Sequence, residues 1–451
     1  MNLNLINNIF FLGIGGIGMS GLARYFMMKK YEVFGYDRES SSITSDLEKN
    51  GAVICHDIKS FDMNYFHNNK EKTIVIYTPA VSKNHPLFKK FKSHNFKIYK
   101  RAQIIEQISK DSRCIAIAGT HGKTTTSSIL AHILHEANLS FCALVGGIME
   151  NYNSNFLFKG NEYFLIEADE FDRSFLHLRP EFACITSIDN DHMDIYENSN
   201  NLNEAFKNFA KNLIDGGFLI SNDGVDIGGE KYGFESNSKY RAINTEYKSG
   251  FSQFDIQIDD NIFKNFKIKL SGEHNVLNCL AAVILALKLG ISESIILNAV
   301  STFKGVKRRF SYVINSKKII LIDDYAHHPE EISKIHKSLR IIYPNEKISA
   351  IFQPHLFSRT INLIDDFANE LSKFDNVILL EIYPAREEPI GGVSSSLLLE
   401  KIRLENKIIC QKSEISHSIL NIGNKINVLM GAGDIANEVE SIKQEILICN
   451  T

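Results

Sequence analysis

Residues 113–136 read RCIAIAGTHGKTTTSSILAHILHE. The first six form an apolar run of strand length, and the end of the stretch repeats apolar residues on one helical face. The repeating residues are Ile129, Leu130, Ile133 and Leu134. Between strand and helix lies GTHGKT, residues 119–124, in the context that a phosphate-binding loop requires. The stretch therefore predicts a site for a nucleoside triphosphate.

The loop also assigns roles to its residues. Those expected to hold the triphosphate are Gly119, Thr120, His121, Gly122, Lys123, Thr124 and Thr125. Glycines let backbone N–H groups close around a polyphosphate at the positive end of a helix. Lys123 would reach the outer phosphates, and the Thr124 hydroxyl would hold Mg²⁺. The usual loop begins with a glycine where this chain has Ile117, but the flanking strand and helix disfavour the alternative of a chance glycine turn.

Length and composition limit the class of protein. With 451 residues, 44% of them hydrophobic and 23% charged, the chain is too long for one core, and two or three domains are expected. A net charge of -3 gives no electrostatic footprint for nucleic acid. The 7 scattered cysteines suggest reduced thiols in a cytoplasm. No secretory signal or membrane-spanning segment is apparent, so we expect a cytoplasmic protein without membrane insertion.

A second glycine-rich turn lies near the N-terminus. Residues 9–12 read as a buried strand, 13–18 as the turn GIGGIG, and 19–30 as a helix. A strand over 32–36 then ends in Asp37, near the place where a Rossmann acid holds a ribose. Alone, this pattern predicts a dinucleotide fold and an NAD-dependent enzyme. However, such a turn selects a diphosphate rather than a nicotinamide, and UDP carries the same group.

Acidic residues follow two predicted strands of the central region. The strand 163–166 leads to Glu167, Asp169 and Glu170. The strand 183–187 leads to Asp189, Asp191, His192 and Asp194. Mg²⁺ prefers oxygen ligands and keeps several waters, so one or two acids per ion suffice. Solvated acidic loops are the alternative, but two such clusters in one nucleotide domain favour a metal site.

The next segment, residues 215–270, is expected to contribute few catalytic or binding residues. Residues 215–270 are rich in Gly, Ser, Asn and Lys, which predicts edge strands and loops. A long apolar helix is then expected over 276–289. Asn275 and Asn278 lie in its first turn, where they could pair with a base edge; helix capping is the alternative for Asn275.

The last third of the chain alternates strands, polar loops and helices. Predicted strands over 319–322, 348–352, 377–382 and 428–430 each end in a polar cluster. Open α/β sheets bind ligands outside the carboxyl ends of parallel strands. The clusters supply His327, His328, His355, Arg359 and Arg386. A single histidine in such a place is more often structural, but this set on one rim predicts a site.

An ordered set of motifs along nearly the whole chain resembles that of the Mur ligases, ATP-dependent amide-bond-forming enzymes of bacterial cell-wall precursor synthesis. The motifs are GIGGIGMS (13–20), GTHGKTTT (119–126), EADEFDRSFL (167–176), DHMDIY (191–196), GEHNVLN (272–278), GVKRRF (305–310), DDYAHHP (323–329) and QPHLFSRT (353–360). A lone glycine motif is weak evidence, whereas this ordered set is strong. The family's own loop lacks the early glycine, so Ile117 agrees with the resemblance.

The resemblance implies an α/β fold with three domains. These are a Rossmann-like UDP-sugar-binding domain over 1–110, a central P-loop ATPase-type domain over 111–311, and a Rossmann-like amino-acid-binding domain over 312–451. The residues implied for the UDP-sugar are Gly13, Gly15, Gly16, Gly18, Met19, Ser20 and Asp37. Asn275, Asn278 and Arg309 join the loop residues at ATP, and the implied metal-site residues are Thr124, Glu167 and His192.

By the same resemblance, the catalytic residues are Lys123, His327, His328 and Arg359, and the amino-acid site consists of Tyr325, His355 and Arg359. Many relatives have an arginine after the equivalent of His355, but this chain has Leu356, which leaves Arg359 as the surer anchor for the carboxylate of the amino acid. His327 or His328 could accept the amine proton, and water or phosphate remain alternatives.

The resemblance further implies a reaction through an acyl phosphate. The expected substrates are UDP-N-acetylmuramate, L-alanine and ATP, with Mg²⁺ as a cofactor and with a monomer or weak homodimer as the acting form. A related ligase that adds a recycled tripeptide to the same UDP-sugar is the nearest alternative, and residues 167–176 favour alanine. An NAD-dependent oxidoreductase would not explain the loop at 119–124. A non-catalytic nucleotide switch would not explain the histidines and arginines that follow the strands in the last third of the chain.

Overall fold

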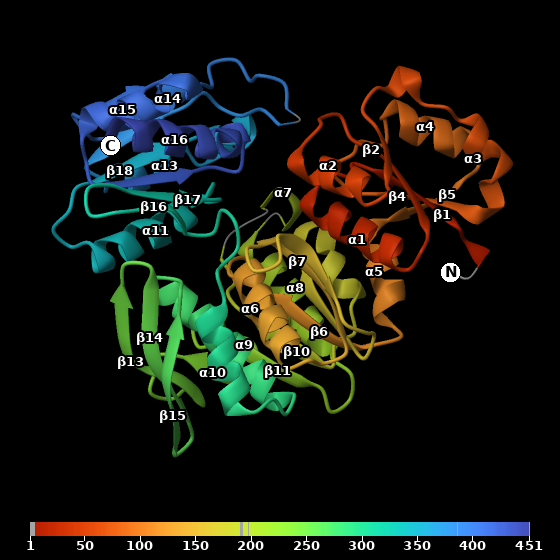
Figure 1. The fold of residues 1–451 in the computed structure, drawn as a ribbon, viewed down its shortest axis with the longest axis horizontal. Coiled ribbons are helices and arrows are strands. Elements are labelled where there is room, and N and C mark those ends of the chain that lie inside the picture. Colours follow the sequence, from red (N-terminus) through yellow and green to blue (C-terminus); the bar gives the residue numbers. More distant parts are fainter. Residues whose placement is uncertain (1–4, 190–192, 197, 386, 451) are drawn as a thin grey trace. The chain divides into compact units, whose positions relative to one another are not determined.

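The computed structural model describes residues 5–189, 193–196, 198–385 and 387–450. Their contacts divide the chain into two compact units. The first comprises Met1–Ile243, Asp255–Phe266 and Leu277–Phe303, and the second Asn244–Phe254, Lys267–Val276 and Lys304–Thr451. Each unit is built of α/β layers, and the expected α/β class is confirmed (Figure 1).

The N-terminal sheet has five parallel strands in the order β3-β2-β1-β4-β5. They are β1 (Asn8–Leu12), β2 (Glu32–Tyr36), β3 (Val53–Cys55), β4 (Thr73–Tyr77) and β5 (Lys97–Lys100). The associated helices are α1 (Ile17–Met28), α2 (Ser42–Lys49), α3 (Asn64–Asn68), α4 (Pro86–Ser93) and α5 (Arg101–Ser109). The Rossmann-like expectation holds. Helix α1 begins at Ile17 rather than Met19, because extended Gly16 (ψ 141) is already its N-cap.

The central sheet has ten strands in the order β15-β14-β13-β12-β11-β10-β6-β9-β7-β8. They are β6 (Arg113–Ala118), β7 (Phe141–Met149), β8 (Ser154–Phe158), β9 (Tyr163–Ala168), β10 (Phe182–Ile185), β11 (Phe218–Asn222), β12 (Glu230–Gly233), β13 (Tyr240–Lys248), β14 (Phe251–Ile258) and β15 (Asn261–Ile268). Its helices are α6 (Lys123–Glu136), α7 (Met193–Tyr196), α8 (Ser199–Lys211), α9 (Glu273–Lys288) and α10 (Glu293–Thr302). Strand β6 and helix α6 match the prediction for 113–136.

The expectation of edge strands over 215–270 holds only for β15, at the end of the sheet order, and is wrong for β11, β12, β13 and β14, which all lie inside it. Strands β11 and β12 lie between β10 and β13. Their hydrophilic side chains are satisfied locally: Lys231 donates to the Ile227 carbonyl at 2.9 Å and to the Ser221 hydroxyl at 2.9 Å. A hydrophilic pattern can therefore belong to an interior strand when its polar groups find backbone partners.

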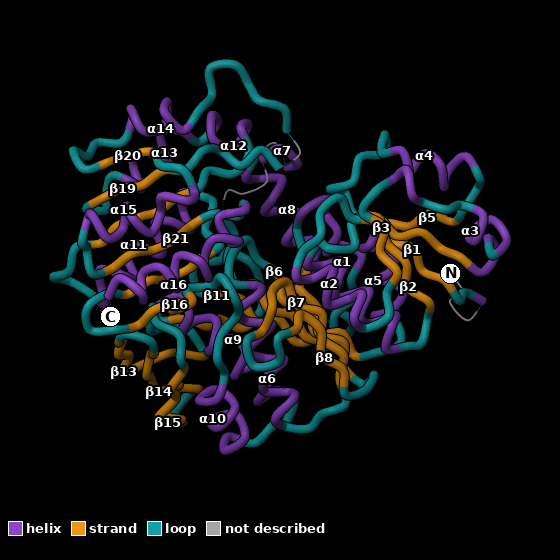
Figure 2. The backbone as a smooth tube through the Cα atoms, turned by 45° about the horizontal axis from the view of Figure 1, so that its top comes forward, coloured by secondary structure: helices purple, strands orange, loops and turns teal. Residues whose placement is uncertain are grey.

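The third sheet has the order β16-β17-β21-β18-β19-β20, parallel except for β16. Its strands are β16 (Ser311–Asn315), β17 (Ile320–Asp324), β18 (Ile348–Phe352), β19 (Asn376–Leu379), β20 (Lys407–Ile409) and β21 (Ile426–Met430). Its helices are α11 (Pro329–Ile342), α12 (Phe357–Asn362), α13 (Ile364–Leu371), α14 (Ser395–Lys401), α15 (Ile415–Ile422) and α16 (Val439–Asn450) (Figure 2).

Two apolar layers cover the faces of this third sheet. Ile322 and Phe352 point into a core with α11, α13 and α14, whereas Leu321 and Ile351 point into a core with α15 and α16. Side chains alternate between the faces of a strand, so each strand supplies both layers. The four loops that follow β17, β18, β19 and β21 leave from one rim of the parallel strands, as predicted.

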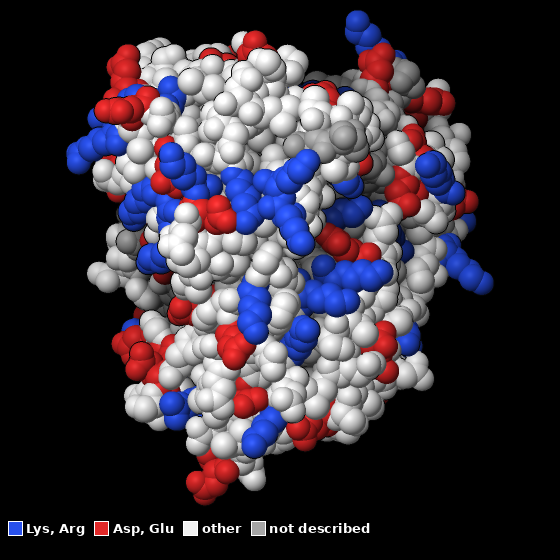
Figure 3. Space-filling model, turned by 60° about the vertical axis from the view of Figure 1, so that its left-hand side comes forward, with Lys and Arg blue, Asp and Glu red and all other residues white. Residues whose placement is uncertain are grey.

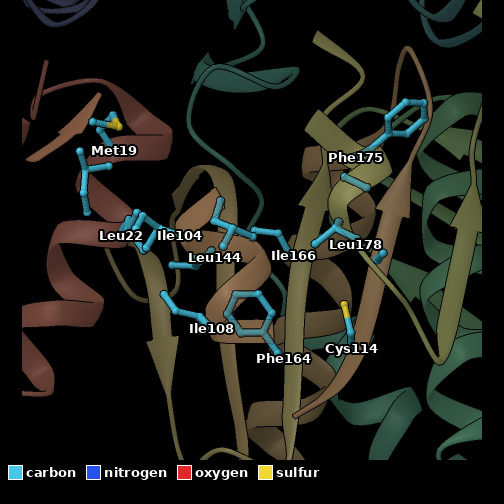
Figure 4. Packing of buried hydrophobic residues seen from close by; sticks show 14 of the residues in the cluster. Met19, Leu22, Ile104, Ile108, Cys114, Leu144, Phe164, Ile166, Phe175 and Leu178 are labelled. Atoms are coloured by element: carbon cyan, nitrogen blue, oxygen red, sulfur yellow. The ribbon is translucent and has the colours of Figure 1, made fainter. Parts of the chain in front are cut away.

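One hydrophobic core joins the N-terminal helices to the central sheet within the first unit. Leu22 of α1 and Ile104 and Ile108 of α5 belong to the same cluster as Leu144 and Phe164 of the central strands (Figure 4). The shared core explains why residue contacts place both sheets in one unit. None of the described helices is long and apolar enough to cross a membrane.

Helix α6 carries a buried histidine whose titration should affect stability. His132 is 3% exposed, and its ring hydrogen-bonds to the hydroxyls of Tyr152 (2.6 Å) and Thr302 (3.0 Å). Burial lowers the pKa of His132 to about 4. Between this value and the unfolded pKa of about 6.5, the unfolded chain binds a proton that the folded chain does not, so acid destabilises the fold.

We expect wild type to lose about 2 kcal/mol more unfolding free energy than His132→Gln between pH 7 and pH 5. Urea denaturation of both proteins at both pH values measures this difference. Equal losses in the two proteins would show that His132 titrates in the fold as it does in the unfolded chain.

Candidate functional site

The loop 119–124 folds sharply between β6 and α6 and requires both of its glycines. Gly119 has φ +134° and Gly122 has φ +86°, conformations that disfavour other residues. A Cβ on Gly119 would collide with the Thr186 hydroxyl, and one on Gly122 would lie 2.5 Å from Asn278 Oδ1. The loop backbone therefore takes the tight course that phosphate binding needs.

Lys123 is the first residue of α6, and its ammonium group is surrounded by oxygen atoms that accept its hydrogen bonds. Nζ donates to both carboxylate oxygens of Glu170, at 2.9 and 2.7 Å, and to the Gly119 carbonyl. The side chains are 15% and 1% exposed. Burial alone lowers the pKa of Lys123, but the nearby carboxylates, Glu170 foremost, more than offset it and raise the pKa above its usual value. Lys123 thus remains a cation at the mouth of the loop.

Thr124 and Glu167 form an oxygen-rich site beside this lysine. The Thr124 hydroxyl donates to Glu167 Oε2 at 3.0 Å, and the Ser127 hydroxyl donates to Glu167 Oε1 at 3.0 Å. The Gly146 N–H also donates to Glu167. Hydroxyl and carboxylate oxygens are the ligands that Mg²⁺ prefers, so Thr124 and Glu167 suit that ion. His192, the third predicted metal residue, lies outside the described residues.

Two residues after β10 support the loop from the opposite side. Ser187 Oγ accepts from the His121 N–H at 3.0 Å and bonds Thr120 Oγ1 at 2.9 Å, while the Thr186 hydroxyl donates to the Ala118 carbonyl at 3.1 Å. His121 Nε2 lies 3.4 Å from Asp189. Thr186 and Ser187 were not among the predicted site residues, although two polar residues at the end of an apolar strand in a nucleotide domain are a signal that the sequence contains.

The two predicted base-binding asparagines have different surroundings. Asn278 belongs to the first unit, where its Oδ1 accepts from the Thr126 hydroxyl at 3.3 Å beside Gly122. Asn275 belongs to the second unit, where its side-chain amide donates to the Ser271 carbonyl at 2.8 Å. Asn278 therefore lies at the phosphate loop, whereas the bond of Asn275 holds the start of α9.

The N-terminal turn is closed by the predicted acid. Asp37, just after β2, accepts from the Gly15 N–H at 2.8 Å. Gly13 has φ +82°, and a Cβ on Gly15 would lie 2.9 Å from the Asp37 carboxylate. Met19 and Ser20 lie in the first turn of α1, after the N-cap Gly16. The turn and Asp37 thus come together at the carboxyl ends of β1 and β2.

In the second unit, Tyr325, His327 and His328 follow β17. His327 Nδ1 lies 2.9 Å from the Tyr325 carbonyl, to which it donates, and 3.4 Å from the Glu331 carboxylate. His328 is the N-cap of α11, and its Nδ1 accepts from the Glu330 N–H at 3.4 Å. The guanidinium groups of Arg308 and Arg309 each lie 5.2 Å from the Tyr325 ring centroid.

The loop after β18 brings the remaining predicted residues to the same rim. The His355 ring stacks on Tyr383 with centroids 5.7 Å apart and lies 6.1 Å from the His327 ring. Arg359, on α12, has a buried Nη1 without a hydrogen-bond partner among the described residues. An unpaired buried guanidinium nitrogen suits a carboxylate ligand. Tyr383 follows one of the strands with a predicted polar cluster but was not among the predicted site residues, and Arg386 lies outside the described residues.

Comparison with known proteins agrees with this arrangement. The family model described as Mur ligase family, catalytic domain matches residues 8–113, the Mur ligase middle domain matches 117–286, and the Mur ligase, glutamate ligase domain matches 308–435. A UDP-N-acetylmuramate–L-alanine ligase of Christiangramia forsetii is 46% identical over 447 residues, covering 99% of each chain. The chain belongs to the Mur ligase family.

Solved Mur ligases have the same architecture. The UDP-N-acetylmuramate-alanine ligase of Thermotoga maritima has a TM-score of 0.81 at 26% identity, over 98% of this chain and 99% of its own. A murein peptide ligase of Psychrobacter arcticus has a TM-score of 0.69 at 22% identity, over 97% and 98%, and shows the fold alone. The expected three-domain Mur ligase fold is therefore confirmed.

Proposed function

We propose that this protein joins L-alanine to the lactyl carboxylate of UDP-N-acetylmuramate, coupled to the cleavage of ATP to ADP and phosphate, the first amino-acid addition in peptidoglycan precursor synthesis. One observation carries the proposal: at the phosphate loop, Lys123 pairs with Glu170 at 2.7 Å, and the next residue, Thr124, donates to Glu167 at 3.0 Å. The full-length similarity to alanine-adding Mur ligases supports the choice of substrates.

The first step brings an anion to an anion. A lactyl carboxylate oxygen attacks the γ-phosphorus of ATP, and the bond from this phosphorus to the oxygen that bridges it to the β-phosphate breaks. ADP departs, and the sugar-borne acid becomes an acyl phosphate. At about 4 Å and an effective dielectric near 20, each like-charge pair costs roughly 4 kcal/mol. The Lys123 ammonium and the fixed N–H groups of the loop offset this repulsion where charge develops. Mg²⁺, held by Thr124, Glu167 and His192, would supply further positive charge at the phosphates.

The second step forms the amide. The alanine amine attacks the acyl carbon, phosphate leaves from the tetrahedral intermediate, and the amine gives up a proton. His327 is the better candidate base, because the bond from its Nδ1 to the Tyr325 carbonyl orients the ring and assigns proton transfer to Nε2. The Nδ1 of His328, in contrast, accepts a backbone N–H at the start of α11. Arg359 would anchor the alanine carboxylate, with Tyr325 and His355 around the side chain.

The remaining assignments belong to the same proposal. The UDP-sugar would bind at the glycine turn and Asp37, and ATP at the loop with Asn275, Asn278 and Arg309. The three domains would be 1–110, 111–311 and 312–451, a division that the ranges of the three family models support. The protein would act in the cytoplasm as a monomer or weak homodimer. None of its seven cysteines, which all belong to the described part of the chain, forms a disulfide, in agreement with a reducing compartment.

Phosphate release tests the proposal. Purified protein with ATP, Mg²⁺ and UDP-N-acetylmuramate should release phosphate when alanine is added. Serine, glycine and the recycled tripeptide, each supplied instead of alanine, test the choice of acceptor. Turnover with the tripeptide but not with alanine would identify the other ligase, and release without the UDP-sugar would indicate a different acid.

Arg359→Lys should lower kcat/KM for alanine by about tenfold to a hundredfold and leave the KM for ATP unchanged. A lysine keeps the charge but loses the forked pair of N–H donors that matches a carboxylate. Initial rates at varied alanine and varied ATP measure both constants. Arg403→Lys, a change at an exposed arginine outside the site, is the control. An unchanged kcat/KM for alanine would move the carboxylate anchor elsewhere.

A further inference from the structure

The side chain of Arg101 lies beside the junction between the glycine turn 13–18 and helix α1. Arg101 is the first residue of α5, and its guanidinium group lies against Gly18 in the first turn of α1. A Cβ on Gly18 would overlap Arg101 Nη1 and would lie 2.9 Å from Cζ. The missing side chain at Gly18 therefore makes room for this guanidinium, which no sequence motif singled out.

The guanidinium is only loosely paired within the protein. Nη2 donates to Asp169 Oδ2 at 3.4 Å, and over the described residues this is its one hydrogen bond. Arg113, by comparison, holds Glu181 with two nitrogens at 2.9 and 2.7 Å. The side chain of Arg101 is 23% exposed. Most of its five N–H donors are thus available to a ligand.

Its position is electrostatically unfavourable without an anion. The first turns of α1 and α5 both lack acidic residues, and Gly16 caps α1 without a side chain. The N-terminus of a helix carries a partial positive charge, so a cation is repelled there. Arg101 lies at two such termini at once. The single long contact with Asp169 offsets this repulsion only in part. A bound diphosphate would carry enough negative charge to make the position of the Arg101 cation favourable.

The surroundings hold this cation in place before any ligand arrives. Leu22 of α1 and Ile104 and Ile108 of α5 share one buried core (Figure 4). Lys100, the preceding residue, pairs with Asp172 at 2.6 Å. Arg101 therefore depends on packed helices rather than on a mobile loop, the arrangement that a preorganised binding residue requires.

We propose that Arg101, whose guanidinium fills the space left by the missing side chain of Gly18, binds the diphosphate of the UDP-sugar beside the glycine turn. The inference rests on the proposed function, because it takes the glycine turn as the UDP-sugar site. Arg101 supplies the forked donors that suit phosphate oxygens, and the first turn of α1 supplies N–H groups. Asp169 orients the guanidinium in the absence of substrate.

Calorimetric titration of the full-length protein with UDP, UDP-N-acetylmuramate and a non-hydrolysable ATP analogue tests the inference. Arg101→Met should bind UDP and the UDP-sugar about tenfold to a hundredfold more weakly and the ATP analogue as wild type does. Arg101→Lys should recover part of the loss. Lys97→Met, which removes the same charge from an exposed position on β5, should change none of the three affinities.

Two further variants separate contact with the ligand from a structural role. Asp169→Asn should keep its UDP affinity within about twofold, since it leaves the guanidinium beside the turn. Gly18→Ala should weaken UDP binding in wild type but add nothing in the Arg101→Met background, because the added Cβ acts by displacing Arg101.

The outcomes are distinguishable. Wild type that binds UDP and an Arg101→Met variant that binds it equally well would overturn the inference alone. An equal loss for the ATP analogue, or an equal loss in Asp169→Asn, would assign Arg101 a structural role and also overturn it. Wild type that binds neither UDP nor UDP-N-acetylmuramate would remove the proposed function, and the inference with it.

Discussion

Lys123→Ala is expected to slow acyl phosphate formation by about a thousandfold, while the Kd for UDP-N-acetylmuramate stays at the wild-type value. The variant loses the cation that offsets the approach of the carboxylate to the γ-phosphate, an effect of the size known for single preorganised groups. The UDP-sugar is expected at the glycine turn 13–18, away from this loop. Single-turnover quenching with labelled ATP measures the first effect, and calorimetry the second.

The same variant leaves a buried carboxylate without its cation. Glu170 is 1% exposed on its side chain and pairs with Lys123 at 2.7 Å. Removing one partner of such a pair costs about 3–5 kcal/mol of stability. The double variant Lys123→Met with Glu170→Gln should recover stability but not activity, which separates loss of folding from loss of chemistry. Lys207→Ala, at an exposed lysine on α8, is the activity control. Loss of UDP-sugar binding in folded Lys123→Ala would contradict separate sites.

Glu167→Gln should lower kcat by about a hundredfold or more and raise the Mg²⁺ concentration needed for half-maximal rate. The carboxylate accepts from the hydroxyls of Thr124 and Ser127, each at 3.0 Å, and from the Gly146 N–H. A glutamine would turn an NH₂ group toward one of these donors and would offer the metal a neutral oxygen. Rates measured over a range of Mg²⁺ concentrations test the prediction.

Glu162→Gln is the matched control for this experiment. Glu162 immediately precedes β9, the strand that ends near Glu167, and its side chain is 52% exposed. The control should show wild-type dependence on Mg²⁺. If Glu167→Gln also kept that dependence, the metal would have to be held by other residues.

Surface charge gives little guidance to these sites. On the face presented in Figure 3, lysine and arginine side chains are interspersed with acidic ones. The net charge of -3 is small for 451 residues. Anionic substrates therefore depend on local cations such as Lys123 and Arg101, which one-residue substitutions can test.

The sequence predicted the parts of the fold that depend on local pattern. The loop 119–124, the turn 13–18 and the acid at Asp37 were readable because each is a short motif between a strand and a helix. The buried strands β1, β4 and β18 were readable because they are continuous apolar runs. Strands β11 and β12 were misjudged because they lack an apolar pattern: their polar side chains Ser221 and Lys231 both donate to the backbone carbonyl of Ile227.

The partners of the site residues were not predictable in this way. Glu170 holds Lys123 across 47 positions of sequence, and Ser187 supports His121 across 66. Arg101 reaches Gly18 and Asp169 only through the packing of α1 and α5 in one core. Such contacts arise from tertiary structure, so a single sequence carries no spacing that would reveal them.

The most direct test follows one oxygen atom. UDP-N-acetylmuramate labelled with ¹⁸O in the lactyl carboxylate is incubated with enzyme, ATP, Mg²⁺ and alanine, and the released phosphate is analysed by mass spectrometry. The account predicts one ¹⁸O atom in each phosphate formed from fully labelled substrate, because the attacking carboxylate oxygen leaves with the phosphate. Unlabelled phosphate released alongside the new amide would contradict an acyl phosphate intermediate.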